Sequence, residues 1–135
     1  MRILFVDTSY WVARFNRHDQ WHQKARELSS QLGDAQLLTS ELVLVECLNY
    51  FSAFGAEMRQ KVAIAVQNIL EAPDIQVTWQ THSLFEAGLT LYRSRLDKGY
   101  SLTDCVSMVV MRQEAIQRVL THDKHFGQEG FTILL

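Results

Sequence analysis

The sequence contains few residues of the kinds that interrupt or cross-link a chain. Its 135 residues include one proline, six glycines and two cysteines. So little proline and glycine argues against linkers and low-complexity segments, and a chain of this length is expected to form a single domain over residues 1–135. Such a chain buries roughly two-thirds of its unfolded surface, which is enough for a core without disulfide bonds. Cys47 and Cys105 lie in apolar helical segments, so we expect buried, reduced thiols.

Long hydrophobic runs are also absent. Apolar stretches such as residues 42–45 are far shorter than the ~20 residues that a membrane-spanning helix requires. The N-terminal segment has one basic residue, Arg2, then a short apolar run and Asp7, which is unlike a secretory signal. The sequence therefore predicts a cytoplasmic protein without a membrane partner.

The chain lacks an excess of basic residues. It has 13 lysines and arginines against 15 aspartates and glutamates, a formal net charge of -2. Nucleic-acid-binding domains usually carry a basic excess, so this balance by itself counts against such a function. The balance is compatible with nucleic-acid binding if the acidic residues concentrate in one metal site and the basic residues line its rim.

Predicted strands and helices alternate along the chain. Apolar patterning and turn residues predict strands at residues 3–6, 36–38, 75–79, 118–120 and 130–134. They predict helices at residues 10–15, 19–32, 41–54, 57–70, from Thr81 or Ser83 to 96, and 101–114. This alternation indicates an α/β domain whose central sheet has four to five mostly parallel strands flanked by helices. In such sheets, ligands bind beyond the carboxyl ends of the strands.

Four acidic residues fall near that edge of the predicted sheet. Asp7 and Asp123 follow strands, whereas Asp104 lies near a helix start and Glu46 lies one to two turns into another helix. Taken alone, Asp7 or Asp123 could cap a helix or form a turn. Asp104 could likewise form a capping box with Ser101. Glu46 has almost only apolar neighbours, and a lone buried carboxylate requires a counter-charge or a metal ion.

Together, the four carboxylates predict a metal site. They would repel one another strongly, and a hard divalent cation such as Mg²⁺ removes that repulsion while it also contacts phosphate. This is the chemistry of metal-assisted phosphodiester hydrolysis, in which the ion helps to ionise a water and stabilises the leaving oxygen. Asn49, three residues after Glu46, is expected to orient that glutamate, and Ser101 is expected to support Asp104.

The same residues carry a family resemblance over essentially the whole chain, from residue 3 to residue 135. The sequence resembles the PIN-domain ribonucleases, and in particular the VapC-type toxins of bacterial and archaeal toxin–antitoxin pairs. Each motif is weak alone, and the combination is specific. The motifs are Val-Asp7-Thr-Ser, Glu46 within an apolar helix, Ser-Leu-Thr-Asp104 and Leu-Thr-His-Asp123-Lys-His-Phe126.

The resemblance implies a twisted parallel sheet, an acidic Mg²⁺ or Mn²⁺ site and cleavage of RNA. Asp7 and Asp104 would be the principal metal ligands. Glu46 and Asp123 would complete the site directly or through water, and Thr121 would support the last acid. A housekeeping RNA-processing enzyme built on the same domain remains an alternative to a toxin.

The resemblance also implies partners. VapC-type toxins usually form homodimers, and a segment of a cognate antitoxin covers the active-site groove. Trp11, Phe15, Tyr50 and Phe54 could line that groove, although each could equally belong to the core.

Several basic residues are candidates for contacts with RNA or metal. Arg93, Arg95 and Lys98 precede the helix of Asp104 and could bind the RNA backbone. Arg14 and Arg17 are further candidates for such contacts. His18 and His22 have the spacing of helical zinc ligands but no evident third ligand. His122 and His125 flank Asp123 and could contact phosphate, although we expect them to be exposed to solvent.

Other functions fit less well. A phosphatase of the haloacid-dehalogenase type would carry a second aspartate two residues after Asp7, where Ser9 stands. A receiver domain would have adjacent acids near the end of the first strand. A non-catalytic RNA- or protein-binding module on the same fold remains open, because fold alone does not determine function. Metal binding would distinguish that module from a nuclease.

Overall fold

Strands and helices alternate in the computed structural model, which describes residues 2–135. The strands are β1 (Ile3–Val6), β2 (Gln36–Ser40), β3 (Ile75–Thr78), β4 (Arg118–Leu120) and β5 (Thr132–Ile133). The helices are α1 (Thr8–Phe15), α2 (His22–Gln31), α3 (Glu41–Tyr50), α4 (Ala56–Glu71), α5 (His82–Ser94), α6 (Leu102–Gln113) and α7 (Lys124–Gln128).

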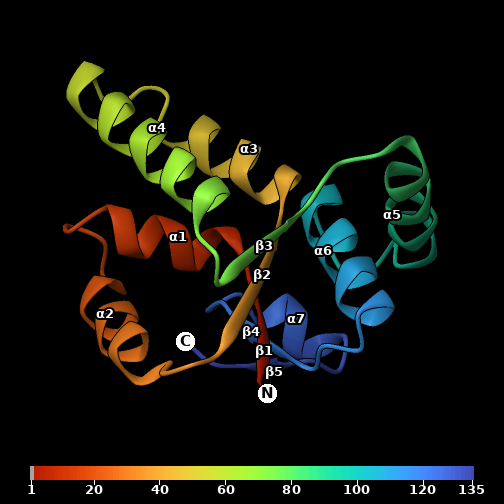
Figure 1. Ribbon diagram of the computed structural model, residues 1–135. Helices are drawn as coiled ribbons and strands as arrows, with labels where there is room; N and C mark the ends of the chain where they lie inside the picture. The colour runs from red at the N-terminus through yellow and green to blue at the C-terminus, as the bar shows by residue number, and fades with distance from the viewer. Residues whose placement is uncertain (1) are drawn as a thin grey trace.

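The five strands form one parallel sheet in the order β3-β2-β1-β4-β5. The predicted α/β fold with a parallel sheet is therefore confirmed. Central strand β1 is apolar because both of its faces are covered, and Leu4, Phe5 and Val6 are almost fully buried. Helices α1 and α2 lie on one side of the sheet. Helix α6 lies on the other side, and α5 lies outside α6 (Figure 1).

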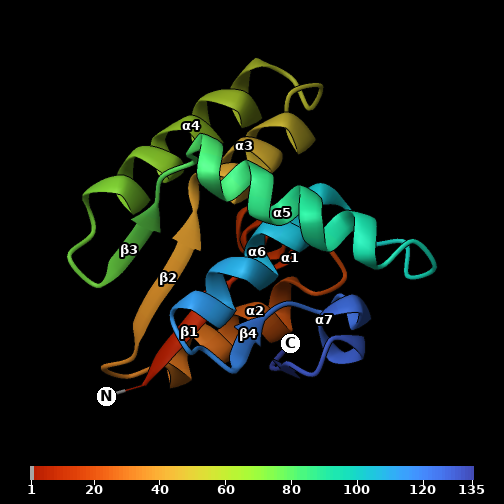
Figure 2. The same ribbon diagram turned by 90° about the vertical axis from the view of Figure 1, so that its right-hand side faces the viewer.

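Three helices begin at the carboxyl edge of the sheet. Helix α1 follows β1 directly, and the carbonyl of Asp7 accepts the Tyr10 amide at 3.2 Å. Helix α3 follows β2 directly, and the Ser40 hydroxyl accepts the Val43 amide at 3.1 Å. The start of α6 meets the same edge, so the two ribbon views place α1, α3 and α6 around one end of the strands (Figures 1 and 2).

The largest differences from the predicted helices lie at three places. The helix predicted from residue 19 begins at His22, because the Asp19 carboxylate accepts the Trp21 amide at 2.8 Å and forms a turn there. The helix predicted to reach residue 54 ends at Tyr50, and turns follow it. The predicted elements do not include short helix α7, for which Asp123 was only a candidate cap. The Asp123 carboxylate accepts the His125 amide at 2.9 Å and caps this helix.

Cys47 and Cys105 are buried and free, as predicted. Among residues 2–135, no helix is both long enough and apolar enough to span a membrane.

Helices α5 and α6 pack closely against each other (Figure 2). A Cβ atom added at Gly88 would lie 2.6 Å from Cγ2 of Val106, a side chain that is itself fully buried. Only a residue without a side chain therefore allows the two helices to approach this closely.

We expect Gly88→Ala to lower the free energy of unfolding by about 1–3 kcal/mol, because overpacking outweighs the gain in helix propensity. Urea denaturation measures this change. In a Val106→Ala background the same substitution should cost much less, since the opposing methyl group is gone. An equal cost in both backgrounds would contradict this explanation.

Candidate active site

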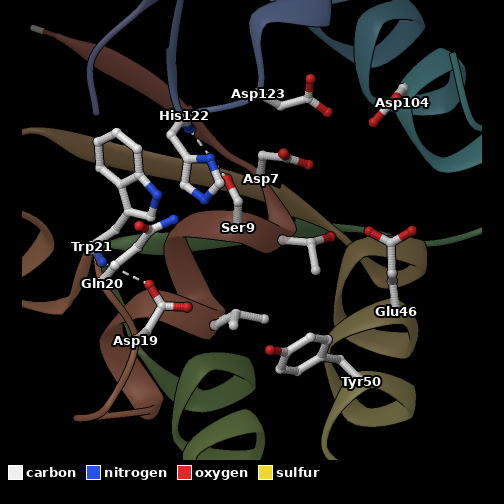
Figure 3. A pocket seen from close by; sticks show the side chains of 12 residues that line it. Asp7, Ser9, Asp19, Gln20, Trp21, Glu46, Tyr50, Asp104, His122 and Asp123 are labelled. Atoms are coloured by element: carbon white, nitrogen blue, oxygen red, sulfur yellow. Dashed lines mark hydrogen bonds between the residues drawn. The ribbon is translucent and has the colours of Figure 1, made fainter. Parts of the chain in front are cut away.

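A pocket of about 330 Å³ lies at the carboxyl edge of the sheet. The structure brings the four predicted acids to its lining from four different parts of the chain (Figure 3). Asp7 follows β1, Glu46 lies in the second turn of α3, Asp104 lies in the first turn of α6, and Asp123 precedes α7. The close-up view shows the carboxyl groups of Asp7, Asp104, Asp123 and Glu46 around a common space.

Asp7 lies at the centre of this group and is 4% exposed. Its Oδ2 accepts a hydrogen bond from the Thr121 hydroxyl at 2.8 Å, whereas its Oδ1 has no partner among the described residues. Burial, followed by the nearby charge of Asp104, raises the pKa of Asp7 to about 7. A buried carboxylate oxygen without a donor is the position that a cation would satisfy, so the site fits a divalent metal ion.

Thr121 and Ser9 connect the segments that carry two of these acids. The hydroxyl oxygens of Ser9 and Thr121 lie 2.8 Å apart, and the Asp123 amide donates to Oγ1 of Thr121 at 3.0 Å. Thr121 therefore contacts both Asp7 and the backbone of Asp123, whereas the resemblance implied support of the last acid alone. Ser9 was not predicted as a site residue, although it is the last residue of the Val-Asp7-Thr-Ser motif.

Asp104 is both a helix cap and a lining residue of the pocket. It is 7% exposed and forms the complete capping box of α6. Its Oδ2 accepts the Ser101 amide at 3.1 Å, and its own amide donates to the Ser101 hydroxyl at 3.0 Å. Burial raises the pKa of Asp104, and the charge of Asp123 adds to this effect. The two interpretations of Asp104 are therefore compatible, because the cap fixes the carboxylate that faces the pocket.

His125 is a site residue that the sequence did not reveal. Its Nδ1 lies 3.3 Å from Oδ2 of Asp104 and 3.4 Å from Oδ1 of Asp123. These three side chains offer ligand atoms that all lie within 4.8 Å of one another. The prediction that His122 and His125 face solvent is wrong, since both are half-buried. Only the position of His125 in the first turn after Asp123 could have indicated this contact.

Helix α3 is not buried on most sides, in contrast to the prediction. Glu46 is half-buried, and its neighbour Val45 is 44% exposed. Asn49 is exposed and lines a separate hollow with Arg59 and others, so the structure does not bring it into the acidic pocket. Side chains three positions apart on a helix point in directions that differ by about 60°, and this rotation turns Asn49 away from the pocket that Glu46 lines.

The basic residues predicted to contact RNA do not line the pocket. Arg95 forms an ion pair with Glu129 at 2.9 Å, and Lys98 lies 3.7 Å from Asp97. Arg93 is exposed on α5. Arg95 is therefore held by a protein carboxylate, and the sequence did not indicate this because its partner lies 34 residues away.

Glu129 joins three parts of the fold near the site. Its side chain is 6% exposed and accepts hydrogen bonds from Arg95, Arg112 and Tyr100. These donors, Arg95 first, lower the pKa of Glu129 to about 2. The Tyr100 ring in turn lies 5.3 Å from the His125 ring, so the cluster supports the histidine that contacts Asp104.

The proposed zinc pair does not form. Nδ1 of His22 lies 2.6 Å from the carbonyl oxygen of Ala13, to which it donates, and His18 is exposed. Within residues 2–135, the only three His, Cys, Asp or Glu ligand atoms that all lie within 4.8 Å of one another are those of Asp104, Asp123 and His125.

Aromatic residues considered for a groove divide into two kinds. Trp11 is only 6% exposed and belongs to the core, so it does not line a groove. Phe15 is half-buried and stacks on Trp11 with ring centroids 5.8 Å apart. Tyr50 and Phe54 are 49% and 47% exposed, and Tyr50 lines the acidic pocket.

We expect Asp7→Asn to stabilise the metal-free protein above neutral pH. The folded state raises the pKa of Asp7 from 3.8 to about 7, so the unfolded state loses its proton first and stability falls as the pH rises through this window. The free energy of unfolding of the variant should exceed that of the wild type at pH 8 by at most about 4 kcal/mol. Thermal unfolding in EDTA at pH 4 and pH 8 measures it, with exposed Asp34→Asn as the control. A variant that is less stable than the wild type at pH 8 would show that burying the Asp7 carboxylate carries no such cost.

Glu129→Gln should have the opposite pH dependence. The lowered pKa means that the carboxylate contributes stability above about pH 4.5, and that this contribution is lost as the pH falls toward 2. We expect a loss of about 2 kcal/mol at pH 7 that becomes smaller at pH 3. Chemical denaturation at pH 7 and pH 3, with the exposed Glu71→Gln variant beside it, tests this. A constant difference would show that the charge is unimportant.

Comparison with known proteins identifies the domain. Residues 4–130 match the PIN domain family. The chain is 29% identical over 129 residues to the 23S rRNA-specific endonuclease VapC20 of Mycobacterium tuberculosis, covering 96% of this chain and 95% of the relative. The crystal structure of that protein, a sarcin–ricin loop cleaving toxin, superposes with a TM-score of 0.83 at 30% identity, covering 96% of each chain.

Two more distant structures share the fold. VapBC2 from Rickettsia felis, bound to a DNA fragment from its promoter, has a TM-score of 0.66 at 15% identity, covering 98% of this chain and 97% of the other. FitAcB from Neisseria gonorrhoeae has a TM-score of 0.64 at 12% identity, covering 98% and 96%. Taken with the match over residues 4–130, these findings establish that the chain belongs to the PIN domain family.

Proposed function

We propose that this protein is a divalent-metal-dependent endoribonuclease and the toxin of a VapBC-type toxin–antitoxin pair. The observation that carries the proposal is the convergence of four carboxylates in one pocket, with a buried oxygen of Asp7 left without a donor. The similarity to the 23S rRNA-specific endonuclease over 96% of the chain supports RNA as the substrate class.

Asp7 and Asp104 would be the principal ligands of Mg²⁺ or Mn²⁺. Both are buried and have raised pKa values, so a cation would displace protons from the site and relieve the repulsion between them. Glu46 and Asp123 would complete the ligand set directly or through water. When held by these residues, the ion would supply activation of a water and stabilisation of the leaving oxygen in phosphodiester hydrolysis.

The remaining residues of the site hold these ligands in place. Thr121 donates to Asp7, which leaves the other oxygen of that carboxylate for the ion. Ser101 fixes Asp104 through the capping box. His125 lies between Asp104 and Asp123, where it offsets part of their repulsion by a hydrogen bond.

We also propose a cognate antitoxin and a homodimer as partners. The pocket edge carries exposed Tyr50, and a neighbouring hollow is lined by Phe54, Met58 and Lys61, among others, which together suit an antitoxin segment with an apolar side chain. A second copy of the chain would cover exposed apolar residues on α3 and α5. These residues are Val45, Leu48, Phe85, Leu89 and Tyr92.

The purified protein should cleave a sarcin–ricin loop hairpin of 23S rRNA in the presence of Mg²⁺ or Mn²⁺. Asp7→Asn and Asp104→Asn should each lose roughly 10²–10³-fold in kcat/KM, because several kcal/mol of transition-state stabilisation depends on the ion. Thr121→Val should lose about 10–100-fold. Gel analysis of end-labelled RNA measures all of these.

EDTA and the exposed Asp34→Asn variant are the matched controls for this experiment. Activity that survives EDTA, or that persists in Asp7→Asn, would contradict the metal mechanism. A folded protein that binds Mn²⁺ but cleaves neither this hairpin nor total RNA would contradict the proposed ribonuclease activity. A folded protein that binds no metal would favour the non-catalytic module.

A further inference from the structure

One wall of the acidic pocket is aromatic. The rings of Trp21 and His122 stack with centroids 4.7 Å apart and planes inclined by 12°. Both residues line the same pocket as Asp7 and Asp123. In Figure 3 the two rings lie on one side of this pocket and Glu46 lies on the other, with Asp7 between the rings and Glu46. We call Trp21 and His122 the aromatic wall.

Hydrogen bonds fix the backbone of both residues of the aromatic wall. The His122 amide donates to the Ser9 hydroxyl at 3.3 Å, and Ser9 contacts Thr121, which donates to Asp7. On the other side, the Trp21 amide donates to the Asp19 carboxylate at 2.8 Å. A binding surface that is ordered before its ligand arrives loses little conformational entropy on binding.

The wall also has polar and cationic neighbours. Asp19 and exposed Gln20 line the pocket beside Trp21. Nζ of Lys24 lies 5.6 Å from the centroid of the Trp21 ring. Trp21 and His122 are only half-buried, so part of each ring is available to a ligand. A planar apolar surface with hydrogen-bonding groups at its edge and a positive charge beside it matches the chemistry of a nucleotide.

We propose that the aromatic wall stacks an unpaired nucleobase of the RNA strand, adjacent to the phosphate that is cleaved. This inference rests on the proposed ribonuclease function and names the substrate feature that the site recognises. Asp19 and Gln20 contact the edge of the base, and Lys24 attracts a backbone phosphate of the same segment. A base in a continuous duplex cannot enter the pocket, so the site selects loops and unstacked nucleotides.

An abasic scan tests the proposal on the wild-type protein and on Trp21→Ala. Each nucleotide around the cleaved bond of the hairpin is replaced in turn by an abasic one, and kcat and KM are measured. We expect Trp21→Ala to lower kcat/KM by roughly 10- to 100-fold on intact RNA, mainly through KM. At one position, the abasic nucleotide should lower kcat/KM of the wild type by the same factor as Trp21→Ala does on intact RNA. The same abasic substrate should not lower kcat/KM of the variant any further.

Two variants control for a merely structural role of the tryptophan. Trp21→Phe keeps a stacking ring and should recover most of the activity. Trp79→Ala removes a 60% exposed tryptophan that does not line the pocket and should leave kcat/KM unchanged. Thermal unfolding verifies that each variant is folded, and His122→Leu replaces Trp21→Ala if the latter fails to fold.

The outcomes separate this inference from the proposed function. If the wild type cleaves RNA but the effect of Trp21→Ala is the same on every abasic substrate, the wall is structural and the inference is wrong. Unchanged kcat/KM on intact RNA would also overturn it and leave the wall to a protein partner. If the wild type cleaves no RNA with either metal, both the function and the inference fail.

Discussion

The burial of the Asp7 carboxylate is the constraint on which the site depends. The carboxyl end of the central strand places this side chain where four acids meet, with a hydrogen bond to only one of its oxygens. Without a cation, burial and the neighbouring charge of Asp104 raise its pKa to about 7. The geometry is therefore unfavourable in itself and would become favourable with a divalent ion bound, which is typical of a site where function is favoured over stability.

Several interactions that stabilise the fold also orient the acids. The capping box of α6 fixes Asp104, and the hydroxyl of Thr121 contacts both Asp7 and the segment of Asp123. Glu129 connects Arg95, Arg112 and Tyr100 beneath the His125 side of the site. The rigid elements of the sheet and its helices thus carry the site, and this is how side chains are held within the tolerance that catalysis demands.

The pocket has two chemically different sides. Carboxylates line one side and are suited to a metal ion and a phosphate, while the stacked rings of Trp21 and His122 line the other. An almost neutral chain with a net charge of -2 is consistent with this arrangement, because a bound divalent ion rather than a basic patch would supply the positive charge at a phosphate. Membership of the PIN domain family accounts for the fold, and the side chains of this chain determine the character of the pocket.

The sequence by itself determined the alternation of strands and helices, the parallel sheet and the four acids, because these follow from local patterning and from the ends of elements. Tertiary structure decided the partners of those residues. Thr121 and Asp7 are 114 residues apart, and Arg95 and Glu129 are 34 apart, so no local pattern reports either contact. It also decided which faces are covered: α3 reads as buried from its composition, yet Val45 is exposed and Asn49 turns away from the pocket. Side-chain direction depends on how elements pack against one another, and packing is a property of the whole chain.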